Sequence, residues 1–172
     1  MAMFSFHLRA VPAVAITFVF AVLSLVKGYE LSPLLTIQML LILHPLYYWG
    51  IFRPSLFPAW AAFLIGFAID IRVGNLLGLN AFLLVMIQVL IGKQQRYLRG
   101  QPFATQWTGF MLLCMAVELI RWAILSVLTM TPFPMTSALV SGLCNAALYP
   151  VTTLVMAMTH RLISGHSYKE LQ

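Results

Sequence analysis

Long apolar runs recur from one end of this sequence to the other, and each approaches the length that a helix needs to cross a lipid bilayer. Hydrophobic residues make up 62% of the 172 residues and charged residues only 8%, which is typical of an integral membrane protein. The runs are too long and too continuously apolar for the alternating strands of a membrane β-barrel. Because backbone polar groups cannot stay unpaired in lipid, the sequence predicts membrane-spanning helices.

Proline, glycine and charged residues divide these runs into six predicted helices, which form a single transmembrane domain over residues 1–172. The predicted fold class is therefore an all-α integral membrane protein, a bundle of six transmembrane helices with short loops. The first run could also be the core of a signal peptide, but no small-residue cleavage site follows it, which favours a span. The expected helices cover residues 9–26, 33–49, 56–72, 76–92, 104–128 and 136–160.

The distribution of Lys and Arg between the predicted helices indicates the orientation of the bundle. With a cytoplasmic N-terminus, only Lys27 and Arg72 fall on the outer side, and an excess of cations inside is the usual arrangement. Both termini are therefore predicted to be cytoplasmic. The basic residues are few and scattered, which argues against a nucleic-acid surface despite a formal charge of +6. The cations placed on the cytoplasmic side are Arg9, Arg53, Lys93, Arg96, Arg99, Arg161 and Lys169.

A carboxylate interrupts the apolar third run, "FLIGFAIDIRVGNLLGLN", at Asp70. At about 1.5 Å per residue, Asp70 lies roughly 21 Å above the inner end of its helix, and Glu118 and Arg121 lie at a similar depth. Asn80, near the start of the next helix, falls in the same layer. Glu118 and Arg121 are three residues apart and can pair. We expect Asp70 to face the interior and to bond either Arg121 or a backbone donor of the 71–80 turn.

Small residues around Asp70 predict where helices approach closely. Ala62, Gly66 and Asp70 recur every four residues and so lie on one helix face, and Gly74 and Gly78 suit a tight turn. In the last helix, "SGLCNAALYP" contains two further polar or bending positions, Asn145 and Pro150. Ionisable residues within spans often mark function, but such a layer can also serve only to fix the packing of the bundle. Both interpretations remain open for this layer.

The motifs of common enzymes are absent from the sequence. It contains no glycine-rich phosphate loop, no paired His or Cys at metal-ligand spacing and no G-x-S-x-G motif. Both cysteines, Cys114 and Cys144, fall within predicted spans, where they are expected to be small buried hydrophobes. We therefore expect neither an enzyme, nor a metal site, nor a cofactor.

The sequence resembles the MreD family of bacterial rod shape-determining membrane proteins over nearly its whole length. The similarity rests on "YYWGIFRP" at the end of the second predicted helix and on "NAALYP" in the sixth, which is followed by a basic tail. Its most specific part is "FLIGFAIDIRVGNLLGLNAFLL". A polar residue midway along the fifth helix also fits the family, whereas Arg121 beside Glu118 is not expected throughout it.

The resemblance implies a non-enzymatic subunit of the cell-wall elongation machinery in the bacterial cytoplasmic membrane, which helps to maintain cell shape. Its implied partners are membrane lipids, the single membrane helix of MreC, the actin-like MreB, and the RodA glycosyltransferase with its penicillin-binding transpeptidase. The family's fold is similar to the substrate-binding component of energy-coupling-factor transporters. Two functions follow as alternatives: a scaffold for a partner's membrane helix, or a binding component that holds a small molecule or lipid headgroup near Asp70, Asn80 and Arg121.

Overall fold

A computed structural model describes residues 2–24, 29–32, 35–37, 41–73, 77–130 and 134–165 of the chain. Six α-helices account for most of this part, and a short antiparallel hairpin and one 3-10 turn complete it. The elements in chain order are α1 (Ala2–Ser24), β1 (Tyr29–Ser32), β2 (Leu35–Ile37), α2 (Leu43–Phe52), η1 (Pro54–Leu56), α3 (Ala59–Val73), α4 (Leu79–Arg99), α5 (Phe103–Thr129) and α6 (Met135–Gly165).

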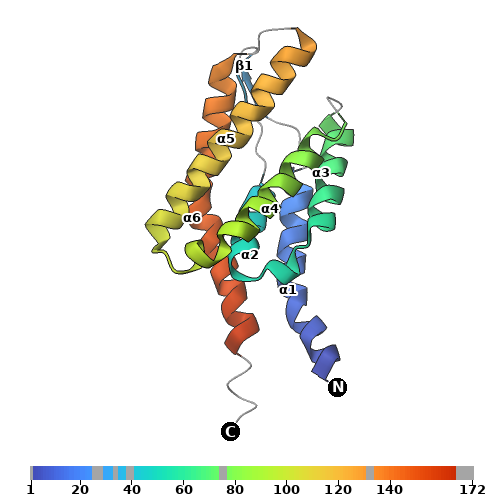
Figure 1. Cartoon of the computed structure of the whole chain (residues 1–172), viewed down its shortest axis with the longest axis vertical. Coiled ribbons are helices and arrows are strands. Elements are labelled where there is room, and N and C mark those ends of the chain that lie inside the picture. The colour runs from blue at the N-terminus through green and yellow to red at the C-terminus, as the bar shows by residue number, and fades with distance from the viewer. Residues whose placement is uncertain are drawn as a thin grey trace.

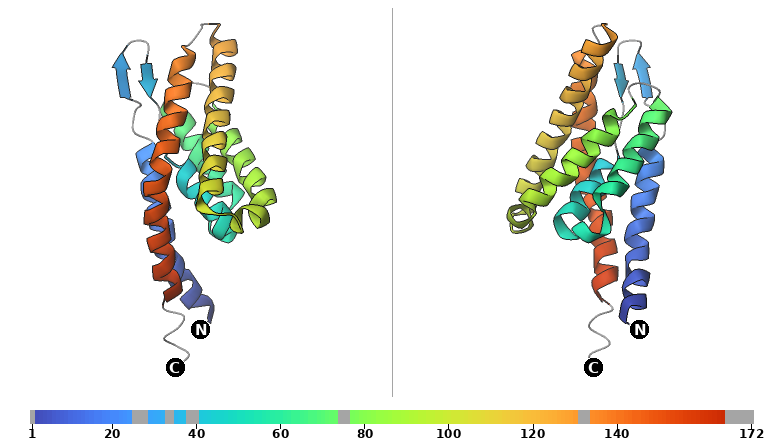
Figure 2. Two further views of the ribbon diagram at one scale, coloured as in Figure 1. Left: turned by 90° about the vertical axis from the view of Figure 1, so that its left-hand side faces the viewer. Right: turned by 45° about the vertical axis from the view of Figure 1, so that its right-hand side comes forward.

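Helices α3 and α4 are antiparallel neighbours, as are α5 and α6, and the short helix α2 packs among them (Figure 1). Helix α3 packs along α4, and α5 packs along α6, while α2 contacts both α4 and α6 (Figure 1). Helix α1 packs against α6 and α2. The start of α1 and the end of α6 lie at one end of the molecule, and the hairpin lies at the other, where α5 ends and α6 begins (Figure 2).

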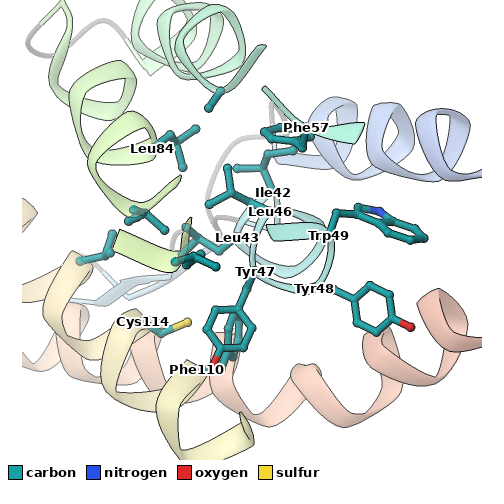
Figure 3. Packing of buried hydrophobic residues seen from close by; sticks show 14 of the residues in the cluster. Ile42, Leu43, Leu46, Tyr47, Tyr48, Trp49, Phe57, Leu84, Phe110 and Cys114 are labelled. Atoms are coloured by element: carbon teal, nitrogen blue, oxygen red, sulfur yellow. The ribbon is translucent and has the colours of Figure 1, made fainter. Parts of the chain in front are cut away.

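The core is built around α2, all of whose residues from Leu43 to Ile51 are buried. A helix that is apolar on every side belongs in an interior, and the side chains of α2 fill the space between the other helices (Figure 3). Tyr47, for example, packs edge-to-face on Phe110 of α5, with ring centroids 5.2 Å apart. Ten residues rise only about 15 Å, half the thickness of the hydrocarbon layer. Helix α2 alone therefore cannot cross a bilayer.

The prediction of a helix over 33–49 is wrong for Leu35–Ile37, while residues 33–34 and 38–40 lie outside the described residues. Leu35–Ile37 forms strand β2, which pairs with β1 in the register Tyr29 to Ile37 and Glu30 to Thr36. A short apolar run does not by itself distinguish a strand from a helix, and Thr36 and Ile37 are β-branched residues that favour strands. The helical class is confirmed, with this hairpin as an addition that an all-α prediction did not contain.

The other predicted helices are present with different ends. Helix α1 begins seven residues before the predicted 9–26, and α4 continues beyond 76–92 to Arg99. Hydropathy locates the edge of an apolar run, whereas Lys93, Gln94 and Gln95 are good helix formers that prolong the helix past that edge. By length and composition, Phe103–Leu128 and Met135–Thr159 are long and apolar enough to cross a membrane, and Pro12–Ser24 is a shorter apolar helix.

Both ends of α2 are satisfied by side chains from other helices. At its start, the Ile42 N–H donates to the Ser24 hydroxyl at the end of α1, at 2.7 Å. At its end, the Arg99 guanidinium of α4 donates to the carbonyl oxygens of Ile51 (2.9 Å) and Phe52 (3.1 Å). Helix ends leave backbone groups without intrahelical partners, and such groups are costly to bury unpaired. Polar side chains thus allow a short helix to begin and end inside an apolar bundle.

Candidate functional site

Asp70 lies on α3, and its carboxylate caps the start of α4. Oδ1 accepts hydrogen bonds from the Asn80 N–H (3.0 Å) and from Asn80 Nδ2 (2.8 Å). Oδ2 accepts from the N–H groups of Gly78 (3.0 Å) and Ala81 (3.1 Å). Of the two partners expected from the sequence, the structure places Asp70 against backbone donors of the turn. The side chain acts as a helix N-cap supplied by a neighbouring helix.

The chemistry of the α4 start explains why a carboxylate stands in this apolar run. The first N–H groups of a helix lack intrahelical acceptors and carry the positive end of the helix dipole, so they favour a negative partner. Asp70 and Asn80 are both buried, which makes an unsatisfied donor there costly. An ionised carboxylate has about four acceptor positions, and here the two oxygens accept two hydrogen bonds each. The Asp70 carboxylate therefore uses its acceptor positions to stabilise the fold.

Gly66 brings α4 close enough for this cap. It lies one turn before Asp70 on α3, and a Cβ atom at Gly66 would lie 2.6 Å from the Ala81 nitrogen and 2.8 Å from the Asn80 carbonyl carbon. Real Cβ atoms do not approach backbone atoms so closely, so only glycine fits. Ala62, one turn earlier, is fully buried. Ala62, Gly66 and Asp70 thus belong to the face of α3 that packs on α4.

The turn before α4 also depends on glycine. Gly78 is the N-cap residue of α4 and has φ of +98°, a left-handed conformation that residues with a Cβ rarely adopt. Gly74, the other glycine predicted for this turn, lies outside the described residues.

The second charged group lies on α5, apart from Asp70. Arg121 Nη1 and Glu118 Oε2 are 3.7 Å apart, and both side chains are buried. Helix α4 lies between α3 and α5 (Figure 1), and every hydrogen bond that Asp70 accepts within the described residues comes from residues 78 to 81. The structure therefore brings Asp70 and Asn80 together and leaves Glu118 and Arg121 as a separate pair.

Of the two predicted positions on α6, Asn145 lies at the contact of this helix with α2. The Asn145 side chain donates through Nδ2 to the Ser141 carbonyl at 3.0 Å, and the Asn145 carbonyl oxygen lies 3.1 Å from His44 Nε2 of α2. Pro150 lies inside the helix. Asn145 is fully buried, so its contacts are internal to the bundle.

An apolar groove opens between α1 and α3. Its volume is about 440 Å³, Trp49 and Phe57 contribute to its floor, and small side chains such as Ala61 and Ala68 line its walls. The Thr17 hydroxyl in the lining donates to the Ala13 carbonyl of its own helix at 2.8 Å. Large apolar side chains on both helices stand exposed beside it, namely Val14, Phe18, Trp60 and Leu64. A groove of this kind suits an apolar chain or helix rather than a polar ligand.

Several of these features had no signal in the sequence. The groove exists because α1 and α3 pack on other helices and leave space between themselves, which no local pattern reveals. The caps supplied by Ser24 and Arg99 reach acceptors or donors far away in the chain. Within the described residues, no group of three or more His, Cys, Asp or Glu side chains is placed to hold a metal ion.

Comparison with known proteins identifies one family. The family model described as rod shape-determining protein MreD matches residues 9–159, which is well over half of the chain. No match is found among curated proteins or among solved structures.

Proposed function

Since this chain belongs to the family of rod shape-determining protein MreD, we propose that it serves as a non-enzymatic membrane scaffold in the cell-wall elongation machinery that sets rod shape. The family is one of bacterial membrane proteins, and the two long apolar helices α5 and α6 agree with insertion into a membrane. Its contact with the machinery is an apolar membrane helix of a partner, for which the single helix of MreC is our candidate. MreB and the RodA–transpeptidase pair then associate with this chain indirectly, through its complex with MreC.

The α1–α3 groove is the observation that carries this proposal. Helices in lipid associate through close packing, to which small side chains contribute most, because no water is expelled between them. The groove extends along α1 from Ala13 to Ala21, about 12 Å, or roughly two turns of a docked helix. Alanines on both walls let a second backbone approach closely, while Phe18 and Leu64 offer large contact surfaces at its sides.

We propose that the chain crosses the membrane six times with both termini in the cytoplasm. The start of α1 and the end of α6 lie at the same end of the molecule, as an even number of crossings requires (Figure 1). Helix α2, at ten residues, is too short to cross alone, so its crossing also needs residues that precede it in the chain. Lys93, Arg96 and Arg99 at the end of α4 then face the cytoplasm, in keeping with the usual excess of cations there.

The alternative, a site for a small molecule or lipid headgroup around Asp70, Asn80 and Arg121, has less support. All four acceptor positions of the Asp70 carboxylate are used by the start of α4. Arg121 lies on α5, with its Nη1 3.7 Å from Glu118 Oε2. The geometry thus favours a scaffold whose polar residues hold its own helices.

Filling the groove is expected to weaken the association with the partner. Ala61→Phe and Ala68→Phe each place a large ring in the space where a helix would dock. We expect at least about a tenfold loss of MreC recovered with the tagged protein from detergent, which corresponds to about 1.4 kcal/mol. Quantitative co-purification measures this loss.

The matched control is Ala123→Phe on α5, an exposed alanine that does not line the groove. Because it adds the same ring to the lipid-facing surface elsewhere, co-purification should stay at the level of the unsubstituted protein. Equal recovery of MreC from the groove variants and the control, with all proteins folded, would show that the groove is not the contact.

A further inference from the structure

Helix α6 continues through Pro150, a residue that cannot donate a backbone hydrogen bond. In a regular helix the N–H of residue 150 would bond the carbonyl of residue 146, so Pro150 leaves the Ala146 oxygen without its helical donor. Trp107 of α5 supplies the replacement, because its indole Nε1–H donates to the Ala146 oxygen at 2.9 Å. One side chain thus fills the vacancy that the proline creates.

The carbonyl of the preceding residue, Asn145, also has a partner on another helix. His44 Nε2 of α2 lies 3.1 Å from the Asn145 oxygen, and the imidazole packs against Phe110 with ring centroids 4.9 Å apart. Side chains from two different helices therefore hold the carbonyls one turn before Pro150. In a bilayer, the Ala146 oxygen that the proline leaves without a helical donor must find a partner on a neighbouring helix, and Trp107 provides it.

The two contacts differ in their surroundings. His44 is buried at 1% exposure, whereas Trp107 is 40% exposed at the surface of the bundle. The indole bond therefore lies at the edge of the bundle rather than in its core. Just beyond the proline, the Thr152 hydroxyl donates to the carbonyls of Leu148 (3.2 Å) and Tyr149 (3.0 Å), a bonding pattern that bends helices further.

Helix α6 has a buried side and an exposed side both before and after Pro150. Before it, Ser141, Asn145 and Tyr149 are buried on the side that faces α2 and α5. After it, Met156 and Thr159 are buried, whereas Val151 and Leu154 are exposed. The lower half of α6 also runs in a different direction from the upper half (Figure 1).

We propose that Pro150 makes α6 a hinge and that Trp107 is the latch that holds it. With the indole bonded to the Ala146 oxygen, the segment after Pro150 keeps its angle to the segment before it. When that bond is released, the lower segment of α6 changes its angle while His44 keeps the upper segment on α2. This hinge does not depend on the identity of any partner.

A double-substitution cycle tests the latch. Trp107→Phe retains an aromatic ring but removes the donor, and Pro150→Ala restores an N–H that bonds Ala146 within the helix. We expect Trp107→Phe to shift the unfolding equilibrium in detergent about fivefold toward the unfolded state. In the Pro150→Ala protein, where the indole is no longer needed, the same substitution should shift it less than about twofold. Equal shifts in both backgrounds would overturn the latch, because they would show that Trp107 acts only through packing.

A distance measurement tests the hinge itself. Spin labels at Leu154 on the lower segment and Tyr97 on α4 occupy exposed positions, once Cys114 and Cys144 are replaced by alanine. Trp107→Phe should broaden the distribution of distances between the labels, and adding Pro150→Ala should narrow it again. Trp60→Phe, which removes an exposed indole elsewhere, should leave the distribution unchanged. An unchanged width in the Trp107→Phe protein would contradict the hinge.

Discussion

Asp70→Ala is expected to lower the free energy of unfolding by about 4 kcal/mol or more, because four hydrogen bonds are lost at once. The substitution leaves the N–H groups of Gly78, Asn80 and Ala81 without their acceptor, and the Asn80 amide loses its bond as well. Each buried donor left unsatisfied costs about 1 to 3 kcal/mol, and the favourable charge at the start of α4 is also lost. Unfolding in mixed detergent measures the change directly, and the yield of folded protein should fall with it.

Two further variants make the Asp70 prediction specific. Arg72→Ala removes an exposed charge from the same helix, so its effect should stay within about 0.5 kcal/mol. Asp70→Asn keeps one acceptor oxygen but turns an amide NH₂ toward backbone donors, so its stability should fall between the other two. If Asp70→Ala proved as stable as Arg72→Ala, the cap would have no energetic role.

Gly66→Ala is expected to cost about 2 to 4 kcal/mol, although it adds a single methyl group. The new Cβ would overlap the backbone of Asn80 and Ala81, which cannot move aside as a flexible side chain could. Helix α4 would have to shift away from α3, so the variant combines the cost of overpacking with strain in the Asp70 hydrogen bonds. The same unfolding assay detects this loss.

Gly92→Ala provides the matched control within the bundle. Gly92 also lies inside a helix, but among the described residues nothing other than its chain neighbours and its own helix backbone lies within 4 Å of the position its Cβ would take. Replacing it should stabilise the protein by up to about 1 kcal/mol, because alanine restricts the unfolded chain and favours helix. The Gly→Ala substitution should thus lower the free energy of unfolding at position 66 and raise it at position 92. Destabilisation of similar size at both positions would contradict the close approach of α4 at Gly66.

The sequence was sufficient to predict the features that depend on local patterns. Apolar runs located the helices, and the four-residue spacing of Ala62, Gly66 and Asp70 identified the face that packs on α4. The turn after Asp70 was predicted because Gly74 and Gly78 suit a tight turn between two helices. The hairpin was not predicted, because the apolar run over 33–49 has the composition of both a buried strand and a helix.

Features that depend on distant contacts could not be predicted in this way. Trp107 bonds a carbonyl 39 residues later in the chain, and Arg99 bonds one 48 residues earlier. Nothing in the sequence around either residue identifies its acceptor, since the pairing exists only once α5 meets α6 and α4 meets α2. For the same reason, the common depth of Asp70 and Arg121 suggested a pairing that the position of α4 between their helices does not produce.

The scaffold proposal is tested most directly by photo-crosslinking in living cells. A photoreactive residue at Leu64, beside the groove on α3, should form a covalent product with the membrane helix of MreC. The same residue at Leu112, which is 67% exposed on α5, should not. A product from Leu112 and none from Leu64, with both proteins present at equal levels, would contradict the account by placing the partner on a different face of the bundle.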